Sequence, residues 1–124
     1  MLDKKPSFSD TCNVAYAMEL LGGKWKVSII WDIARYSPVR TSALRRRLIG
    51  ISEGVLIMQL KALERDHIIR RIDHHEVPPR VEYELTPLGE SLVGVVEQLH
   101  KWGGEHREAQ GRIPPAVQKS PSGL

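Results

Sequence analysis

The sequence predicts a mainly α-helical domain that carries one small β-hairpin. Apolar residues recur at helical spacing in several stretches, both before residue 67 and after residue 87. Between these stretches, Val81, Tyr83 and Leu85 alternate with glutamates, which is typical of a strand with one buried face. Thr86-Pro87 then marks the start of a last helix, because proline is favoured at the first helical position. The 124 residues suit one domain.

The first helix is expected over residues 12–21, because Val14 and Met18 lie on one face of it. Gly22-Gly23 ends this helix, since glycine is the usual residue just after a helix. Residues 1–11 are polar and irregular, and we expect a flexible N-terminal arm there.

Two further helices follow before residue 50. The first of them begins at Lys24 and ends before Ser37-Pro38, and it carries an apolar stripe. The second is short, starts at a cap supplied by Thr41 or Ser42, runs to Leu48 and is stopped by Gly50.

Ser52 is the expected cap of a longer helix that ends near Arg65. Its buried stripe consists of Leu56, Leu60 and Leu63, with His67 as a candidate member at its edge. The turn Ile49-Gly50-Ile51 joins it to the short helix, and a turn this tight needs a residue that tolerates a left-handed backbone. These two helices therefore form a predicted helix-turn-helix.

A hairpin and a long helix complete the domain. The strands are expected over residues 68–72 and 81–85, and Pro78-Pro79 prevents the segment between them from being helical. The last helix starts at Pro87 and is expected to end at Gly103-Gly104. A hairpin directly after the second helix of a helix-turn-helix makes the unit a winged helix-turn-helix. The domain is assigned to residues 12–108, and residues 109–124 are expected to be a disordered tail.

Charge is distributed unevenly along the chain. The net charge of +3 is modest, but residues 35–71 hold nine basic and three acidic residues, whereas residues 81–110 hold two basic and six acidic ones. The basic segment covers the helix-turn-helix, so two independent signals indicate DNA binding. On charge alone, a solvated arginine-rich face is an equal alternative.

Several segments of the sequence resemble the HxlR family of bacterial winged-helix transcriptional regulators. The resemblance extends from about Cys12 to about His106. It is carried by Leu21-Gly22-Gly23-Lys24-Trp25-Lys26, Leu44-Arg45-Arg46, Gly50-Ile51-Ser52, Val77-Pro78-Pro79-Arg80-Val81-Glu82-Tyr83 and Leu85-Thr86-Pro87-Leu88-Gly89. The resemblance implies a homodimer that binds palindromic promoter DNA as a repressor or an activator. In some relatives it also implies a response to electrophiles, oxidants or small ligands.

The helix from Ser52 to Arg65 is the candidate for the major groove, and the arginines near it are candidates for phosphate contacts. The expected DNA-binding residues are Arg40, Ser42, Arg45, Arg46, Ser52, Glu53, Gly54, Ile57, Met58, Gln59, Lys61, Arg65 and Arg80. Three consecutive helical positions span about 200°, so at least one residue of Arg45-Arg46-Arg47 is expected to face elsewhere. Arg80 has an equal alternative, an ion pair with Glu76 or Glu82.

The recognition helix departs from the relatives that it resembles. Gly54 stands where they usually carry Lys or Arg, Ile57 where they carry Thr or Ser, and Met58 where they carry Gln. The outward face therefore lacks the bidentate groups that read guanine or adenine, although Ile57 and Met58 suit contacts with thymine methyl groups.

The first and last helices lie outside the winged unit, and their apolar stripes predict a dimer interface. The expected interface residues are Val14, Met18, Leu92, Val95, Val96, Leu99 and Trp102; the alternative is that they only cover the core. Cys12, at the start of the first helix, matches the cysteine that senses oxidants or electrophiles in several relatives. The alternative for Cys12 is a packing residue.

Other function classes have little support. No Gly-rich phosphate loop and no nucleophile-and-base pattern is present, so an enzyme is not expected. His74-His75-Glu76 is interpreted as a polar hairpin tip, so neither a metal nor a cofactor is expected. The sequence predicts neither a signal peptide nor a membrane span, and a cytoplasmic protein is expected. A winged helix that binds protein instead of DNA is the remaining alternative.

Overall fold

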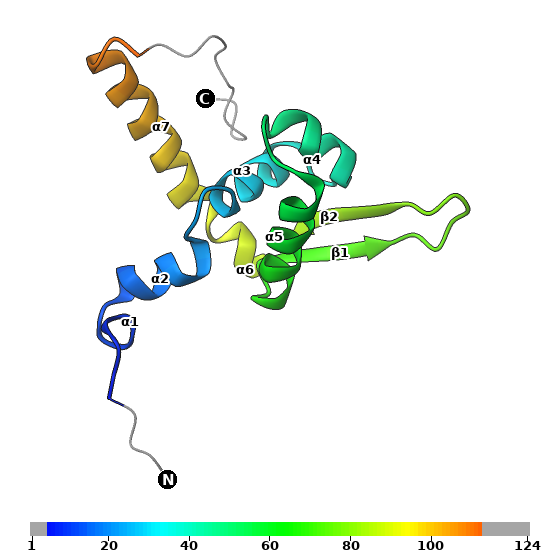
Figure 1. Ribbon diagram of the computed structural model, residues 1–124, viewed down its shortest axis with the longest axis horizontal. Coiled ribbons are helices and arrows are strands. Elements are labelled where there is room, and N and C mark those ends of the chain that lie inside the picture. The colour runs from blue at the N-terminus through cyan, green and yellow to red at the C-terminus, as the bar shows by residue number, and fades with distance from the viewer. Residues whose placement is uncertain (1–4, 113–124) are drawn as a thin grey trace.

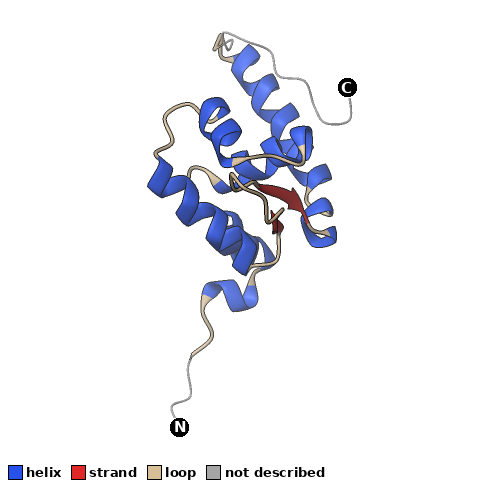
Figure 2. Cartoon of the chain, turned by 90° about the vertical axis from the view of Figure 1, so that its right-hand side faces the viewer, coloured by secondary structure: helices blue, strands red, loops and turns tan. Residues whose placement is uncertain are grey.

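The computed structural model describes residues 5–112, which form a helical domain with one β-hairpin (Figures 1 and 2). In chain order the elements are α1 (Phe8–Thr11), α2 (Asn13–Leu21), α3 (Lys26–Tyr36), α4 (Thr41–Arg47), α5 (Glu53–Arg65), β1 (Ile69–Asp73), β2 (Val81–Leu85), α6 (Pro87–Glu90) and α7 (Val93–Ala109). The predicted fold class is therefore confirmed.

The helix-turn-helix is formed by α4 and α5, as predicted. The Ser52 side chain accepts a hydrogen bond from the backbone N–H of Val55 at 3.2 Å, which caps α5. Gly50 has a φ of 97°, the left-handed conformation that the turn requires. The cap of α4 is Arg40, one residue before Thr41 and two before Ser42, the two caps that were predicted.

The wing is a two-stranded antiparallel hairpin. Its register runs from the Ile69–Leu85 pair at the base to the Asp73–Val81 pair near the tip. Val39, between α3 and α4, exchanges two backbone hydrogen bonds with Tyr83 and so ties the helical layer to β2. The predicted alternation holds for Tyr83 and Leu85, which are buried, whereas Val81 is only partly buried, like the neighbouring glutamates.

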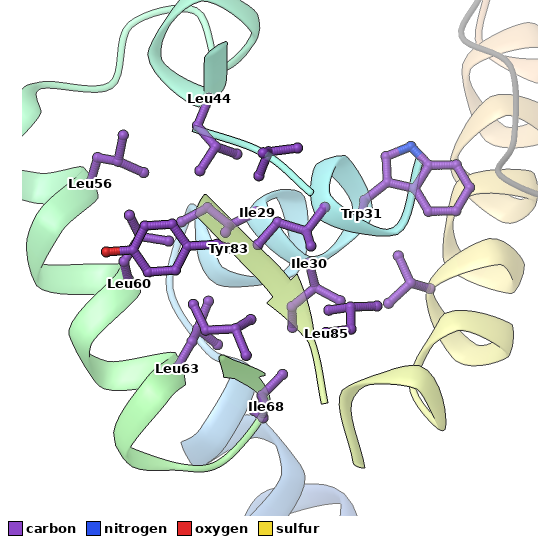
Figure 3. Packing of buried hydrophobic residues seen from close by; sticks show 14 of the residues in the cluster. Ile29, Ile30, Trp31, Leu44, Leu56, Leu60, Leu63, Ile68, Tyr83 and Leu85 are labelled. Carbon is purple, nitrogen blue, oxygen red and sulfur yellow. The ribbon is translucent and has the colours of Figure 1, made fainter. Parts of the chain in front are cut away.

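A single apolar core joins the helix-turn-helix, the wing, α3 and α7 (Figure 3). Its members are Ile29, Ile30, Trp31, Ile33, Val39, Leu44, Ile51, Leu56, Leu60, Leu63, Ile68, Ile69, Tyr83, Leu85 and Val96. Gly89 also lies against it, and a Cβ atom there would stand 2.1 Å from the carbonyl oxygen of Ile68. The helix that follows β2 can approach the core only because residue 89 is glycine.

Three expectations about the elements were wrong. Residues 8–11 form the short helix α1 inside the predicted arm, because a capping box between Ser7 and Asp10 satisfies its first turn. The predicted last helix is divided into α6 and α7, and α7 continues through Gly103-Gly104 to Ala109. His67 has a φ of 61° and is exposed, because the chain turns there out of α5 into β1. Of the predicted arm and tail, residues 1–4 and 113–124 lie outside the described residues.

The two groups of elements outside the winged unit point away from the wing. In Figure 1, α1 and α2 extend to one side below the core and α7 extends to the same side above it, whereas the hairpin tip lies on the opposite side. Within residues 5–112, no helix is both long enough and apolar enough to cross a membrane.

Candidate nucleic-acid interface

The three consecutive arginines of α4 point in different directions. Arg45 and Arg46 are exposed, whereas Arg47 turns toward α3 and binds Asp32. Its Nε and Nη2 atoms each donate a hydrogen bond of 2.7 Å to one carboxylate oxygen of Asp32, which is 1% exposed. This contact also raises the pKa of Arg47 above its already high usual value. The prediction that one of these arginines faces elsewhere is confirmed, and that arginine is Arg47.

Tyr36 forms the second support of Arg47. The guanidinium of Arg47 lies 4.0 Å from the centre of the Tyr36 ring, a cation–π contact. Arg35 lies over the same ring at 5.0 Å and over the Trp31 ring at 5.5 Å. Arg47 therefore serves to hold α4 on α3, and it is not available at the surface in the way that Arg46 is.

An open hollow of about 430 Å³ lies between the end of α3, α4 and β2. It is lined by Tyr36, Pro38, Val39, Arg40, Ser42, Ala43, Arg46, Arg47 and Glu82. Arg40 and Arg46 make no ion pair with any residue between 5 and 112. The hollow therefore presents two unpaired guanidinium groups and the Ser42 hydroxyl to an approaching anion, beside the Glu82 carboxylate, which already has His74 and Arg80 as partners.

The outward face of α5 is exposed along its length. Gly54, Ile57, Met58, Lys61 and Arg65 are all exposed, on the side opposite to the buried leucines, as the helical spacing predicts. Gln59, between the two faces, is only partly exposed.

Two polar residues at the start of α5 already have partners. The Ser52 hydroxyl caps the helix, and a carboxylate oxygen of Glu53 lies 3.7 Å from Nη1 of Arg45. Both side chains of the ion pair are about half or more exposed, so the pair is weak. At the other end of the helix, Arg65 lies 3.9 Å from the carboxylate of Asp66.

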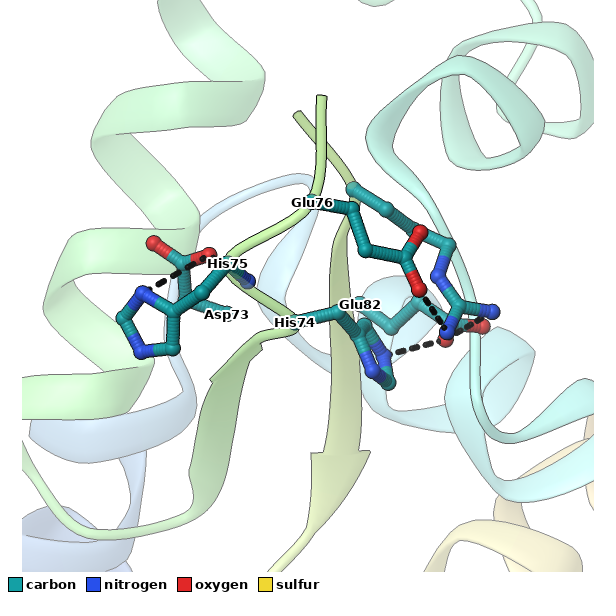
Figure 4. A network of polar contacts seen from close by, with 6 residues as sticks. Asp73, His74, His75, Glu76 and Glu82 are labelled. Atoms are coloured by element: carbon teal, nitrogen blue, oxygen red, sulfur yellow. Dashed lines mark hydrogen bonds and ion pairs between the residues drawn. The ribbon is translucent and has the colours of Figure 1, made fainter. Parts of the chain in front are cut away.

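The arginines of the wing are paired with carboxylates of the wing itself. Arg80 donates to Glu76 at 3.0 Å and lies 3.8 Å from Glu82, while Nε2 of His74 lies 2.7 Å from the same Glu82 oxygen (Figure 4). In the strands, Arg70 pairs with Glu84 at 2.9 Å and Arg71 with Asp73 at 3.9 Å. For Arg80, the ion-pair alternative is therefore the arrangement in the structure.

The carboxylate of Asp73 organises the turn at the wing tip. It accepts a hydrogen bond of 2.8 Å from the backbone N–H of His75, and this bond is the main reason that the pKa of Asp73 lies below its usual value. The charges of His75, Arg71 and His74 act in the same direction. Within the described residues, no group of three metal-ligating side chains is close enough to hold an ion.

The apolar surface outside the winged unit is formed by α2 and α7. Of the predicted interface residues, Val14, Met18, Val95, Leu99 and Trp102 are more than half exposed, and Leu92 is partly buried against the core. Val96 was wrongly assigned to this surface: it is 4% exposed, because it faces α3 and belongs to the core of its own chain.

Cys12 is the N-terminal cap residue of α2, and its thiol is free and partly buried. Its carbonyl oxygen accepts the backbone N–H of Tyr16 at 3.0 Å, which starts the helix. One turn later, Tyr16 and Ala17 line an apolar hollow of about 210 Å³ between α2 and α6.

Sequence reasoning did not identify Asp32 as the buried partner that positions Arg47 of α4. A signal was present, because an acidic residue within the apolar run from Ile29 to Ile33 must be buried and therefore needs a partner. The stack of Trp31 on His100, with ring centroids 4.9 Å apart, had no comparable signal, since it joins residues far apart in the sequence.

Comparisons with known proteins identify the family and find similar transcriptional regulators. The family model described as HxlR-like helix-turn-helix matches residues 20–111. An uncharacterized HTH-type transcriptional regulator of Bacillus subtilis, YtcD, is 42% identical over 94 residues, which cover 76% of this chain and 74% of the relative. Among solved structures, the redox regulator HypR in its reduced form has a TM-score of 0.75 at 34% identity, covering 81% of this chain and 98% of HypR. The oxidized form of HypR has a TM-score of 0.72 at 36% identity, covering 76% of this chain and 96% of HypR.

Proposed function

The chain belongs to the HxlR-like helix-turn-helix family, and we propose that it is a transcriptional regulator that binds promoter DNA. The observation that supports this most directly is the pair of unpaired arginines, Arg40 and Arg46, at the hollow between the end of α3, α4 and β2. They belong to the same helix-turn-helix as α5, whose outward face is exposed. Guanidinium groups in this position suit two phosphate oxygens of a DNA strand, while α5 lies in the adjoining major groove.

The test is a gel shift with the DNA that flanks the gene of this protein, followed by selection of bound fragments from genomic DNA. Arg46→Ala should weaken binding to every fragment by a similar factor, because a phosphate contact is independent of sequence. Lys101→Ala is a matched control, since Lys101 is an exposed basic residue of α7, outside the helix-turn-helix and the wing. Equal binding by Arg46→Ala and wild type would contradict the proposed contact.

We propose that the regulator acts as a homodimer through α2 and α7. Supporting this, Leu99 and Trp102 of α7 and Val14 and Met18 of α2 expose large apolar side chains. Both helices extend to the side opposite to the hairpin tip (Figure 1). A two-fold dimer would place two copies of α5 about 34 Å apart, which corresponds to palindromic half-sites one turn apart. Leu99→Glu should convert the dimer to a monomer in sedimentation experiments, whereas the exposed control Lys101→Glu should not.

We further propose that Cys12 makes binding responsive to oxidants or electrophiles. The position of Cys12 at the start of α2 supports this, because backbone N–H groups at a helix start favour a thiolate. A redox regulator, HypR, is also among the similar structures. Diamide should change the DNA affinity of the wild type and leave Cys12→Ser unchanged. The same response in both would remove this role and leave a small ligand as the effector, with the hollow between α2 and α6 as its candidate site.

A winged helix that binds protein is the second candidate function. The exposed apolar residues Ile57 and Met58 on α5 favour it, because such residues are unusual on a surface that faces only phosphate and base edges. Failure to select any DNA fragment at low salt would support this candidate and contradict DNA binding.

A further inference from the structure

The first two turns of α5 present an apolar surface at the place where a recognition helix meets the bases. Ile57 is 40% exposed and Met58 is 58% exposed, although both are large apolar side chains. Gly54, one turn earlier on the same face, has no side chain, and a Cβ atom there would meet nothing within 4 Å. The backbone of α5 can therefore approach a base edge closely at Gly54, which brings Ile57 and Met58 into reach of the same groove.

The polar residues around this surface are few, and some already have partners. The Ser52 hydroxyl accepts from the N–H of Val55, and Glu53 forms a weak, exposed ion pair with Arg45 at 3.7 Å. Gln59 lies between the outward and the buried face of α5 and is only partly exposed. Lys61, one turn beyond Ile57, is the exposed cation that remains in the middle of the helix, with no ion pair to any described residue. The outward face thus has little capacity to read bases through hydrogen bonds.

The chemistry of the major groove identifies a partner for such a surface. Guanine, cytosine and adenine present hydrogen-bonding groups there, whereas thymine also presents a 5-methyl group, which is apolar. An isoleucine and a methionine gain free energy by removing that methyl group from water, and a guanine edge in the same place would leave its acceptors unpaired.

We propose that Ile57 and Met58 select DNA by contacting thymine methyl groups in the major groove. The operator half-site is then specified by where its A·T pairs place these methyl groups, and bidentate contacts to guanine or adenine do not contribute at this position. This inference rests on the proposed DNA binding and names the chemical feature that the binding recognises.

The experiment replaces thymine by deoxyuridine, one position at a time, in a duplex taken from the selected genomic fragments. The two nucleotides pair identically and differ only in the methyl group. At one or two positions in each half-site, we expect the affinity to fall about fourfold, the equivalent of about 0.8 kcal/mol for one buried methyl group. Replacement at the other thymines should have no effect.

Variants of the protein assign the effect to the two side chains. In Ile57→Ala and Met58→Ala, the deoxyuridine penalty should disappear at the position that each side chain contacts; both residues are exposed, so the fold should be retained. Lys61→Ala is the matched control on the same face, and it should weaken binding while keeping the penalty.

The outcomes separate this inference from the proposed function. A protein that binds selected DNA but tolerates deoxyuridine at every position refutes the thymine contacts and leaves the regulator intact. The same holds if the penalty is equal in wild type, Ile57→Ala and Met58→Ala, because the methyl group then acts through DNA shape. Absence of binding to any fragment would overturn DNA binding and this inference together.

Discussion

Replacing Arg47 by alanine would leave the carboxylate of Asp32 buried without its counter-ion. Asp32 is 1% exposed, and both of its oxygens accept hydrogen bonds of 2.7 Å from the Arg47 guanidinium. The alanine variant removes both donors and leaves space beside Asp32, next to the open hollow that Arg47 lines. The variant should therefore fold less stably, and the loss should be largest at the helix that carries the exposed arginines.

The size of the effect follows from the burial of the two partners. Removal of one member of a buried ion pair costs about 3–5 kcal/mol, because the remaining charge is uncompensated. The side chain of Arg47 is 25% exposed, so water screens part of the interaction and the lower end, about 3 kcal/mol, applies. For a domain of about this length, that corresponds to a fall in Tm of about 12–20 °C.

Urea and thermal unfolding, followed by circular dichroism at one fixed protein concentration, measure this loss. Arg46→Ala is the matched control, since Arg46 is the exposed neighbour and its removal should change stability by no more than about 0.5 kcal/mol. In the gel shift we expect the opposite order: at a temperature where both variants are folded, Arg46→Ala should lower the DNA affinity more than Arg47→Ala does.

A double variant, Asp32→Leu with Arg47→Met, separates the ion pair from general packing. It removes both charges and retains apolar bulk, so it should recover most of the lost stability. If Arg47→Ala and Arg46→Ala proved equally stable, the buried pair would not hold α4 on α3, and this reasoning would be refuted.

Two further predictions concern the core contact of α6 and the wing. Gly89→Ala should destabilise the fold by about 3 kcal/mol or more, because the added Cβ atom would meet the Ile68 carbonyl at 2.1 Å. Gly94→Ala in α7 has open space around the added atom and should stabilise the fold by up to about 1 kcal/mol. Thermal unfolding of both variants measures these changes. The folded pKa of Asp73 lies below its unfolded value, chiefly because of the N–H of His75, so its stabilisation of the wing turn is complete above about pH 4 and is lost as the pH falls through the folded pKa. An NMR titration in which the carboxyl carbon of Asp73 gave a pKa above its unfolded value would contradict this.

Local sequence signals were sufficient to predict the helix-turn-helix and the fact that the arginines of α4 do not all face the same way. The cap at Ser52 and the left-handed turn at Gly50 depend on two or three neighbouring residues, and both are present in the structure. The inward direction of one arginine followed from helical geometry alone. The expected contacts with DNA and the dimer surface remain predictions.

Interactions between distant elements could not be predicted from local patterns. Asp32 and Arg47 lie 15 residues apart, and the choice of Arg47 over Arg46 depends on the angle at which α4 packs on α3. The end of α7 was misplaced because Gly103-Gly104 was treated as a stop signal, although a glycine costs a helix only about 1 kcal/mol. The pairing of Arg80 also required the register of the hairpin, which brings Glu76 and Glu82 to it.

The excess of positive charge in residues 35–71 overstates the charge that is available to DNA. Of the nine basic residues, Arg45, Arg47, Arg65, Arg70 and Arg71 have carboxylate partners within 4 Å. Arg35 lies against aromatic rings, which leaves Arg40, Arg46 and Lys61 without an ion pair among the described residues. Three such cations in each chain of the proposed dimer give about six phosphate contacts, and the logarithm of the affinity should fall with the logarithm of salt with a slope of about −5.

That slope corresponds to a loss of about a thousandfold in affinity between 50 and 200 mM salt. Arg40→Ala, which removes one contact from each chain, should make the slope shallower by about 2, whereas Arg70→Ala should leave it unchanged because Arg70 already neutralises Glu84. A slope much steeper than −5, reduced equally by both variants, would mean that DNA displaces the carboxylates of the wing. In that case the arginines of the wing would exchange their carboxylate partners for phosphates on binding, and all basic residues of segment 35–71 would contribute to the salt dependence of the affinity.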